Sequence, residues 1–345
     1  MTENLHSYRP VLVTGGAGFI GSNFIPFFLE QNPTVFVVNL DKLTYAGCLE
    51  NLISVQDSER YTFVKGDICD EELVEGIFDK YKIERVIHFA AESHVDNSIA
   101  NPADFIKTNI RGTFTLLEAA RKFWLNSDAH TKIGFENARF HHISTDEVYG
   151  SLGPTGFFNE QTSYAPNSPY SASKASSDFL VRSYFHTYGL PVITSNCSNN
   201  YGPHQHDEKL IPTIIRKALS NEPIPIYGDG QNVRDWLYVI DHCKGINAVF
   251  NKGELGQTYV IGGNSECNNL YIAQKICSTL DNLVPKGGGS YKKQISFVKD
   301  RAGHDFRYAI DATKIKKELG WQPEENFDSG IHKTIKWYLN KYQKV

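Results

Sequence analysis

A tyrosine and a lysine spaced for proton transfer give this sequence its first chemical signal. Tyr170 precedes Lys174 by four residues, and in a helix over 170–188 the two side chains would share a face. An ammonium group one turn from a phenol stabilises the phenolate and lowers the pKa of the phenol. Tyr170 could then act as a base on a substrate hydroxyl. Ordinary helix pairs show the same spacing, so the rest of the chain must decide between the two interpretations.

Two adjacent carboxylates follow a hydroxyl residue upstream of this pair. Thr145, Asp146 and Glu147 come directly after the apolar stretch 140–144, which is typical of a strand. Consecutive side chains at a strand end can point in different directions, so the two carboxylates could have separated pKa values and serve as an acid and a base. The alternative is a solvated acidic turn, or Asp146 as the cap of the next segment.

A glycine-rich turn near the N-terminus predicts a dinucleotide site. The short apolar strand 11–13 runs into Gly15, Gly18 and Gly21, and helical spacing follows over 23–30. In such a turn the chain reversal, the close approach of a pyrophosphate and the helix–strand contact each exclude a side chain. The pyrophosphate would lie at the N-terminus of the helix.

Acidic residues and alanines at the ends of later strands extend this site. Strand 35–40 ends at Asp41, where a carboxylate accepts hydrogen bonds from the adenosine ribose and repels a 2′-phosphate, which favours NAD over NADP. Strand 61–64 leads to Asp67, which either reaches the adenine or is a solvated strand-end aspartate. The apolar run 85–91 is typical of a strand buried on both faces, and its two alanines would let a cofactor lie close to the backbone.

Strands alternate with helices through the first half of the chain, with helices expected over 71–81 and 102–124. This alternation predicts an α/β fold with a Rossmann-like, doubly wound parallel sheet and right-handed crossovers. Ligands of such sheets bind beyond the C-terminal ends of the strands. The glycine turn, the strand-end aspartates and the carboxylate pair should therefore face one crevice.

The second half of the chain is less regular and predicts a smaller, interwoven α/β domain that binds the substrate. After one more strand over 191–195, polar and turn-rich segments alternate with short apolar pieces. We expect an NAD-binding Rossmann domain over 9–195, to which 231–254 returns, a substrate domain over 196–230 and 255–325, and a closing helix over 326–345.

Composition and charge limit the classes of partner. The chain has 345 residues, of which 41% are hydrophobic, and a net charge of −4 with dispersed lysine and arginine, which does not favour nucleic acid or an anionic membrane. Its six cysteines form no C-x-x-C pair, residues 1–10 are polar, and no apolar run reaches the roughly 18 residues of a membrane span. We expect a reduced, cytoplasmic, soluble protein with a small-molecule partner and no metal ion.

Several phrases of the sequence together resemble the nucleotide-sugar dehydratases of the extended short-chain dehydrogenase/reductase family. The broader phrases are TGGAGFIG at 14–21, STDEVYG at 144–150 and YSASK at 170–174. The narrower phrases are DKLTYAG at 41–47, AAESHVD at 90–96, SNNYGP at 198–203, EKLIP at 208–212 and VRDW at 233–236. The resemblance covers nearly the whole chain.

The resemblance implies contacts with the cofactor and with the substrate. The implied NAD contacts are Gly15, Gly18, Phe19, Ile20, Gly21, Asp41, Lys42, Leu43, Thr44, Asp67, Ile68, Phe89, Ala90, Ala91, Thr108, Tyr170, Lys174 and Asn200. The implied substrate contacts are Ser93, Thr145, Asn199, Lys209, Leu210, Pro225, Ile226, Tyr227, Arg234, Asn269, Asp300, Arg301 and His304. Arginine suits a diphosphate because a guanidinium matches phosphate oxygens bidentately, although an arginine seen alone is usually a surface ion pair.

The implied activity is that of a lyase that converts dTDP-glucose to dTDP-4-keto-6-deoxyglucose and water, as in rhamnose-type deoxysugar biosynthesis. Tyr170, with Thr145 and Lys174, would take the C4 hydroxyl proton as hydride passes to NAD. Glu147 would remove the C5 proton, Asp146 would protonate the departing C6 hydroxyl, and hydride would return to C6. The alternatives are the same chemistry on UDP-glucose or another nucleotide hexose, a nucleotide-sugar 4-epimerase, and a non-catalytic NAD-binding scaffold.

The resemblance also implies a homodimer. The two helices expected over 102–124 and 170–188 carry apolar residues beyond a single core face. The residues expected at the contact between subunits are Leu116, Leu117, Phe179, Leu180 and Tyr184.

Overall fold

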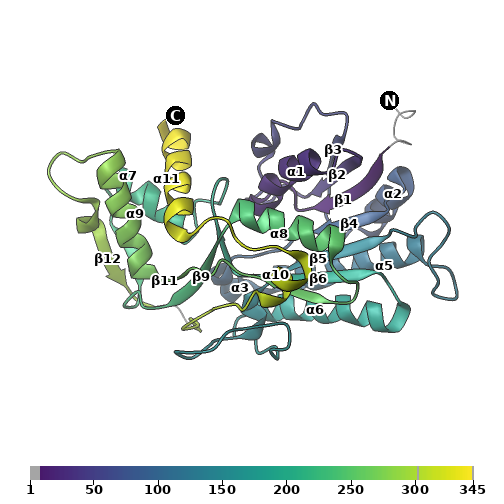
Figure 1. The fold of residues 1–345 in the computed structure, drawn as a ribbon. Coiled ribbons are helices and arrows are strands. Elements are labelled where there is room, and N and C mark those ends of the chain that lie inside the picture. The colour runs from purple at the N-terminus through teal and green to yellow at the C-terminus, as the bar shows by residue number, and fades with distance from the viewer. Residues whose placement is uncertain (1–7, 301–302, 344–345) are drawn as a thin grey trace.

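A seven-stranded parallel sheet forms the larger part of the molecule (Figure 1). The structure is a computed structural model that describes residues 8–300 and 303–343. In chain order the strands are β1 (Arg9–Thr14), β2 (Val35–Asp41), β3 (Tyr61–Lys65), β4 (Arg85–His88), β5 (Arg139–Thr145), β6 (Val192–Cys197) and β10 (Thr258–Ile261). Their order across the sheet is β10-β6-β5-β4-β1-β2-β3, and every pair is parallel. The predicted Rossmann-like α/β fold is confirmed.

Both faces of this sheet are covered by helices, which explains the continuous apolar runs of its strands. One face packs against α1 (Phe19–Gln31) and α8 (Val239–Lys252), and the other against α2 (Glu71–Tyr81), α5 (Thr113–Trp124) and α6 (Pro169–Tyr188). Successive side chains of a strand point to opposite faces. Thus Val11 and Val13 of β1 belong to the core under α1, and Leu12 belongs to the core under α2.

The helix expected over 102–124 contains a π-helical segment. It consists of α4 (Pro102–Phe105), a π-helical segment η3 (Ile106–Gly112) and α5. Inside η3 the side chain of Asn109 is buried; its amide donates to the carbonyl of Glu92 (3.0 Å) and to the hydroxyl of Ser173 (2.8 Å). π-Helical turns often occur at functional sites. The expected helical bounds are confirmed, and the π-helical segment within them was not predicted because the apolar spacing does not show these long-range hydrogen bonds.

The smaller part of the molecule lies at one end of the large sheet (Figure 1). It contains a three-stranded sheet of β7 (Asn199–Tyr201), β9 (Val233–Tyr238) and β11 (Glu266–Asn268), and a pair formed by β8 (Ile224–Tyr227) and β12 (Ile295–Val298). Helices α7 (Leu210–Leu219), α9 (Asn269–Leu283) and α11 (Phe327–Gln343) enclose a separate apolar core. The remaining short helices are η2 (Leu49–Leu52), α3 (Val95–Ala100), η4 (Asp146–Tyr149), η5 (Tyr291–Gln294) and α10 (Thr313–Leu319).

The structure differs from the expected domain boundaries at two points. Strand β10, expected in the substrate domain, is the edge strand of the large sheet, because its buried residues Tyr259, Val260 and Ile261 pair with β6. Strand β9, expected to return to the Rossmann domain, pairs with β7 and β11 in the smaller sheet. We otherwise keep the expected division into two domains as a proposal. Across residues 8–300 and 303–343, none of the helices has the length and apolar character needed to cross a bilayer.

Candidate active site

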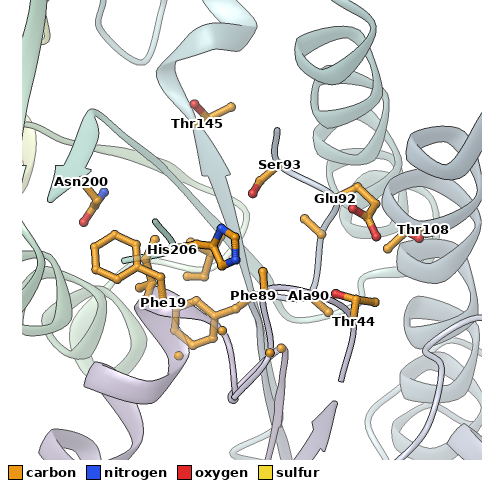
Figure 2. Close-up of a pocket in the computed structure, with 18 of the residues that line it drawn as sticks. Phe19, Thr44, Phe89, Ala90, Glu92, Ser93, Thr108, Thr145, Asn200 and His206 are labelled. Carbon is orange, nitrogen blue, oxygen red and sulfur yellow. The ribbon is translucent and has the colours of Figure 1, made fainter. Parts of the chain in front are cut away.

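Residues at the C-terminal ends of the parallel strands line one cleft (Figure 2). Gly15 follows β1, Asp41 ends β2, Asp67 follows β3, Ala90 follows β4 and Thr145 ends β5, and all five line this cleft. Strand order reverses between β1 and β4, which is where open parallel sheets bind their ligands. The structure therefore brings together the segments that the sequence analysis expected to face one crevice.

The glycine turn forms a cradle with no room for side chains. Gly15 has a positive φ of 71°, and a Cβ atom there would lie 2.6 Å from the backbone nitrogen of Ala90. A Cβ atom on Gly21 would lie 2.5 Å from the carbonyl oxygen of Gly15. Helix α1 begins directly afterwards at Phe19, with Gly18 as its N-cap. The cradle thus opens onto a helix N-terminus, where backbone N–H groups favour phosphate.

Asp41 closes the cradle from β2. One of its carboxylate oxygens accepts a hydrogen bond from the backbone N–H of Ala17 (2.9 Å), and the other accepts one from Leu43 (2.8 Å). Lys42 beside it pairs with Asp67 at 2.9 Å. A carboxylate held in this way can still accept hydrogen bonds from ribose hydroxyls on its free lone pairs. The narrow cradle, the helix N-terminus and this carboxylate together fit NAD.

The two adjacent carboxylates differ in environment. Thr145 is the N-cap of η4: its hydroxyl accepts a hydrogen bond from the backbone N–H of Glu147 (3.3 Å) and donates one to Asp146 (3.4 Å). The second carboxyl oxygen of Asp146, which is 1% exposed, has no partner among the described residues. Burial raises the pKa of Asp146 well above its usual value, and the charge of Glu147 adds to the rise.

Two cations stabilise the charged form of Glu147, whereas one of them, Arg234, acts on Asp146. Burial raises the pKa of Glu147, but the positive charges of Arg234 and Lys209 oppose that rise. Its carboxylate also accepts a hydrogen bond from Ser171 (3.3 Å). The pKa of Asp146 is thus raised further than that of Glu147, so Asp146 is the one of the two that more readily holds a proton, as an acid beside a base requires.

Tyr170 and Lys174 both line the cleft from α6, but not as the sequence predicted. Burial raises the pKa of Tyr170 well above its usual value, the charge of Glu147 adds to the rise, and a hydrogen bond with Thr145 opposes it. The ammonium group of Lys174 donates to the carbonyl oxygen of Ile143 (2.9 Å). For these residues by themselves the predicted lowering of the Tyr170 pKa is not seen, because burial raises that pKa.

Most of the predicted site residues lie on the lining of this cleft. They are Gly15, Gly18, Phe19, Ile20, Gly21, Asp41, Lys42, Thr44, Asp67, Ile68, Phe89, Ala90, Ala91, Ser93, Thr108, Thr145, Asp146, Glu147, Tyr170, Lys174, Asn199, Asn200 and Lys209. Figure 2 shows Phe19, Thr44, Phe89 and Thr145 around the same space.

The other predicted residues do not line the cleft, and Arg301 lies outside the described residues. Those described are Leu43, Leu210, Pro225, Ile226, Tyr227, Arg234, Asn269, Asp300 and His304. The side chain of Ile226 is 1% exposed in the core of the smaller part, so the prediction that it contacts the substrate is wrong for that side chain. Alternation along β8 instead leaves Tyr227 exposed.

Arg234 lies beyond the carboxylate end of the cleft. Its guanidinium donates to the carbonyl oxygens of Val233 (2.7 Å) and Asp305 (3.0 Å) and stacks 4.2 Å from the ring centre of Tyr308. Its charge acts on Glu147, as described above. Backbone carbonyls thus already accept hydrogen bonds from part of the guanidinium that was expected to bind phosphate.

The cleft also contains residues that the sequence analysis missed. They are Leu40, Ala46, Gly47, Gly66, Glu92, Ile143, Ser144, Cys197, Ser198, Gln205, His206 and Glu208. Several of them belong to the sequence phrases quoted above, so their place within those phrases could have predicted them as site residues. At the rim, the hydroxyl of Tyr45 donates to Glu208 (3.1 Å), so the larger and smaller parts of the molecule meet across the cleft.

In sequence and in structure, the chain is similar to several dehydratases. The family model described as GDP-mannose 4,6 dehydratase matches residues 12–334. A dTDP-glucose 4,6-dehydratase of Xanthomonas campestris pv. campestris (strain B100) is 55% identical and covers 95% of this chain and 92% of its own length. Among solved structures, the dTDP-glucose 4,6-dehydratase of Bacillus anthracis str. Ames in complex with NAD is 46% identical, with a TM-score of 0.85 over 97% of this chain and 98% of that one.

Two further solved structures bear on the choice between reactions. The dTDP-glucose 4,6-dehydratase of Streptomyces venezuelae, with NAD and TYD bound, is 42% identical, with a TM-score of 0.87 over 97% of this chain and 98% of that one. A UDP-glucose 4-epimerase of Thermotoga maritima is 29% identical, with a TM-score of 0.83 over 96% of this chain and 99% of that one. The fold is therefore shared with epimerases, and the higher identity is with dehydratases.

Proposed function

This chain belongs to the family of dTDP-glucose 4,6-dehydratases and has the NAD-dependent activity of that family, and we propose that five residues of its cleft carry out the proton transfers. The substrate is a nucleotide sugar, dTDP-glucose, and the products are dTDP-4-keto-6-deoxyglucose and water. The observation that carries the proposal is the pair of neighbouring carboxyls in different environments, Asp146 with a buried oxygen that has no partner among the described residues and Glu147 beside two cations.

The cofactor is NAD, and the glycine cradle, the N-terminus of α1 and Asp41 would hold it. Bound NAD supplies the hydride acceptor for C4 and the hydride donor for C6. The cleft also places the lysine and the tyrosine of α6 on the same lining as this cradle.

Tyr170 would remove the proton of the C4 hydroxyl. Thr145, whose hydrogen bond already opposes the rise in the pKa of Tyr170, favours the phenolate and can also bond the substrate oxygen. Lys174 provides a buried positive charge on the same lining. These three residues account for oxidation at C4.

Glu147 and Asp146 would act after C4 becomes a ketone, because a ketone acidifies the neighbouring C5 proton. Glu147, whose rise in pKa is opposed by two cations, would take that proton as a carboxylate, and Asp146, whose pKa is raised well above its usual value, would give its proton to the C6 hydroxyl as water leaves. A 4-epimerase or a plain dehydrogenase has no step for this second acid and base. The carboxyl pair therefore favours dehydration over the epimerase alternative.

With dTDP-glucose, we expect a 4-keto-6-deoxy product and no accumulation of free NADH, because the hydride taken from C4 returns to C6 of the same molecule. The measurement is the absorbance of the product in alkali over a panel of dTDP-, UDP- and GDP-glucose. We expect kcat/KM for dTDP-glucose to exceed kcat/KM for the other two nucleotide sugars roughly tenfold or more. A different nucleobase would leave polar groups of the site without hydrogen-bond partners and so bind less well. Stoichiometric release of NADH, or a C4 epimer as product, would contradict this proposal.

We also propose that the protein is a homodimer, although not through all the residues expected. Leu116 and Leu117 are fully buried in the core of their own chain, and Tyr184 is 6% exposed, so the prediction of these three as contact residues is wrong. Phe179 of α6 and Phe114 of α5 are 57% and 40% exposed. With Tyr188 and the half-buried Leu180 of α6, these two phenylalanines are the apolar groups that the helices offer to a second subunit.

The Phe179→Asp variant is expected to raise the dissociation constant of the dimer by roughly an order of magnitude or more, because a charge would replace an aromatic ring that the second subunit covers. Phe297→Asp is the matched control, since Phe297 is 58% exposed on β12 of the smaller part. Sedimentation velocity at micromolar concentration measures both variants and the wild type. A monomeric wild type at this concentration would rule out the dimer.

A further inference from the structure

A buried carboxylate that none of the steps above uses lies one turn after Lys174 on α6. Asp178 is 4% exposed. One of its oxygens accepts three hydrogen bonds, from the hydroxyl of Ser144 (3.0 Å), the phenol of Tyr164 (2.9 Å) and the side-chain amide of Asn196 (3.0 Å). These donors come from the end of β5, from the loop before α6 and from β6. Asp178 therefore joins three segments behind the cleft.

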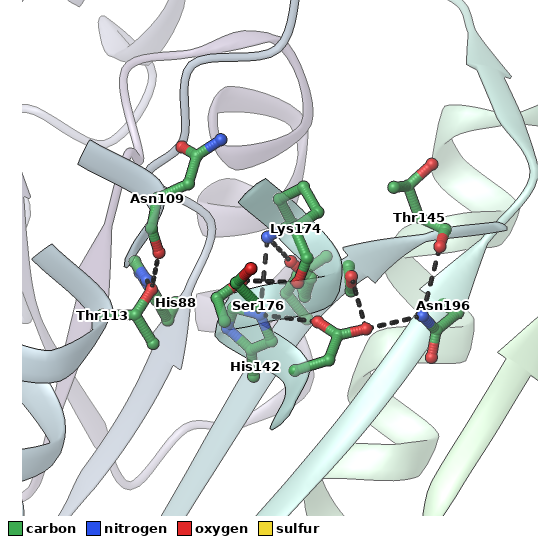
Figure 3. A network of polar contacts seen from close by, with 12 residues as sticks. His88, Asn109, Thr113, His142, Thr145, Lys174, Ser176 and Asn196 are labelled. Carbon is green, nitrogen blue, oxygen red and sulfur yellow. Dashed lines mark hydrogen bonds and ion pairs between the residues drawn. The ribbon is translucent and has the colours of Figure 1, made fainter. Parts of the chain in front are cut away.

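The second oxygen of Asp178 lies against a histidine that in turn lies beside Lys174. Figure 3 shows this histidine, His142, next to Lys174. This oxygen of Asp178 lies 3.1 Å from Nε2 of His142, and that nitrogen lies 3.4 Å from the ammonium nitrogen of Lys174. Burial and the charge of Lys174 lower the pKa of His142 to about 4, so this imidazole is neutral at neutral pH. The buried groups thus lie in the order carboxylate, neutral imidazole and ammonium, and the shared ring nitrogen either donates to Asp178 or accepts from Lys174.

Lys174 needs this carboxylate because its charge is buried. The lysine is 4% exposed, and burial lowers its pKa while the charge of Asp178 raises it. Burial raises the pKa of Asp178. The contact with His142 and the charge of Lys174 lower this pKa by more than burial raises it, so the pKa of Asp178 lies below its usual value. Asp178 is thus an anion that offsets the cost of a buried cation.

The groups that face Lys174 from the surrounding elements leave Asp178 as the anion. They are His88 of β4, His142 of β5, Tyr170 and Asp178 of α6, and Cys197 of β6. Burial lowers the pKa of both histidines and raises that of the thiol, so these three groups are neutral at neutral pH. Burial also raises the pKa of Tyr170, which leaves Asp178 as the carboxylate that faces Lys174.

We propose that Asp178 is a positioning residue, which keeps Lys174 protonated inside the active site and fixes the strand end that carries Thr145. The second role rests on Asn196, whose amide donates both to Asp178 (3.0 Å) and to the carbonyl of Thr145 (3.1 Å). Figure 3 shows Asn196 between Thr145 and this network. The proposal deepens the proposed function, because it takes Lys174 and Thr145 as members of the active site.

The test is Asp178→Asn. The carbonyl oxygen of asparagine can accept from the same three donors and its amide can donate to His142, so the shape is kept and the charge is lost. Activity requires protonated Lys174 and falls as the pH rises through the pKa of this lysine. Without the nearby anion that pKa falls, so the alkaline limb of the kcat profile should move to lower pH by about one unit.

Thermal unfolding gives a second readout that does not depend on activity. Between the lowered pKa of Lys174 in the folded protein and its pKa in the unfolded chain, the unfolded state binds more protons, so stability rises with pH in this window. The window begins at lower pH in Asp178→Asn. The deficit in Tm of this variant relative to the wild type should therefore shrink as the pH rises through the alkaline range.

Tyr164→Phe is the matched control, because it removes one donor to Asp178 and leaves the charge in place. Its alkaline limb should coincide with that of the wild type, and its Tm deficit should not change with pH.

If Asp178→Asn fails to fold, the same two measurements are made on Asp178→Thr, which removes the same charge. The proposal would be overturned if the variant without the charge at position 178 had the same alkaline limb, and the same pH-independent Tm deficit, as Tyr164→Phe. If the pH dependence appears but dTDP-glucose is not dehydrated, the pairing stands and the proposed function falls.

Discussion

The Tyr170→Phe variant is expected to lose roughly two to four orders of magnitude in kcat, which is the usual contribution of one positioned acid–base group. The ring would remain in its buried place, with its edge-to-face contact to Phe105 at 6.3 Å, so the fold should be kept. Only the hydroxyl that takes the C4 proton would be missing. Rapid mixing with dTDP-glucose should show no enzyme-bound NADH, and no deuterium should enter C5 from solvent.

The matched control is Tyr149→Phe. Tyr149 is 3% exposed and lies in η4 beside the carboxyl pair, but its hydroxyl has no partner among the described residues. Its loss should change kcat by about twofold or less, because no hydrogen bond is given up. If Tyr170→Phe kept wild-type NADH formation, another group would have to be the base for C4.

The second large effect is a division of work between the two carboxyls. Glu147→Gln should still oxidise C4, so bound NADH should appear, but exchange of the C5 proton with solvent should fall by about two orders of magnitude or more. Asp146→Asn should oxidise C4 and exchange the C5 proton, yet lose water slowly, because an amide cannot protonate the departing hydroxyl. Absorbance of NADH and deuterium uptake at C5 distinguish the two variants.

Each carboxyl variant serves as the control for the other, since both sit in η4 and each replaces a carboxyl by an amide of the same shape. Equal C5 exchange in Glu147→Gln and the wild type would show that Glu147 is not the base. Rapid loss of water by Asp146→Asn would in turn require another acid, and the buried oxygen of Asp146 would then lack a role.

Local sequence patterns determined the frame of the molecule. The apolar run 85–91 predicted a strand buried on both faces, and Val86 and Ile87 of β4 belong to the two cores on opposite sides of the sheet. Gly15 and Gly21 predicted a turn that excludes side chains, and a Cβ atom at either position would lie within 2.6 Å of the backbone. Such features depend on residues close in the chain, whose spacing fixes direction and steric room.

The sequence also determined which strand ends would meet. Parallel strands present their C-terminal ends at one edge, so Asp41, Asp67 and Thr145 had to lie along the same crevice once the alternation of strands and helices was recognised. The resemblance supplied the contacts that spacing could not, and it was wrong for the side chain of Ile226, which packs into the core of the smaller part.

Only the tertiary structure decided burial, and burial decided the electrostatics. The four-residue spacing from Tyr170 to Lys174 suggested a lowered phenol pKa, but desolvation raises it. Leu116 seemed available for a subunit contact from its helical position, yet the sheet of its own chain buries it completely. The link from Asp178 through His142 to the lysine joins a helix to a strand more than 30 residues away in sequence. The cost of a buried charge depends on every neighbour that replaces water, and those neighbours come from distant segments that no local pattern can contain.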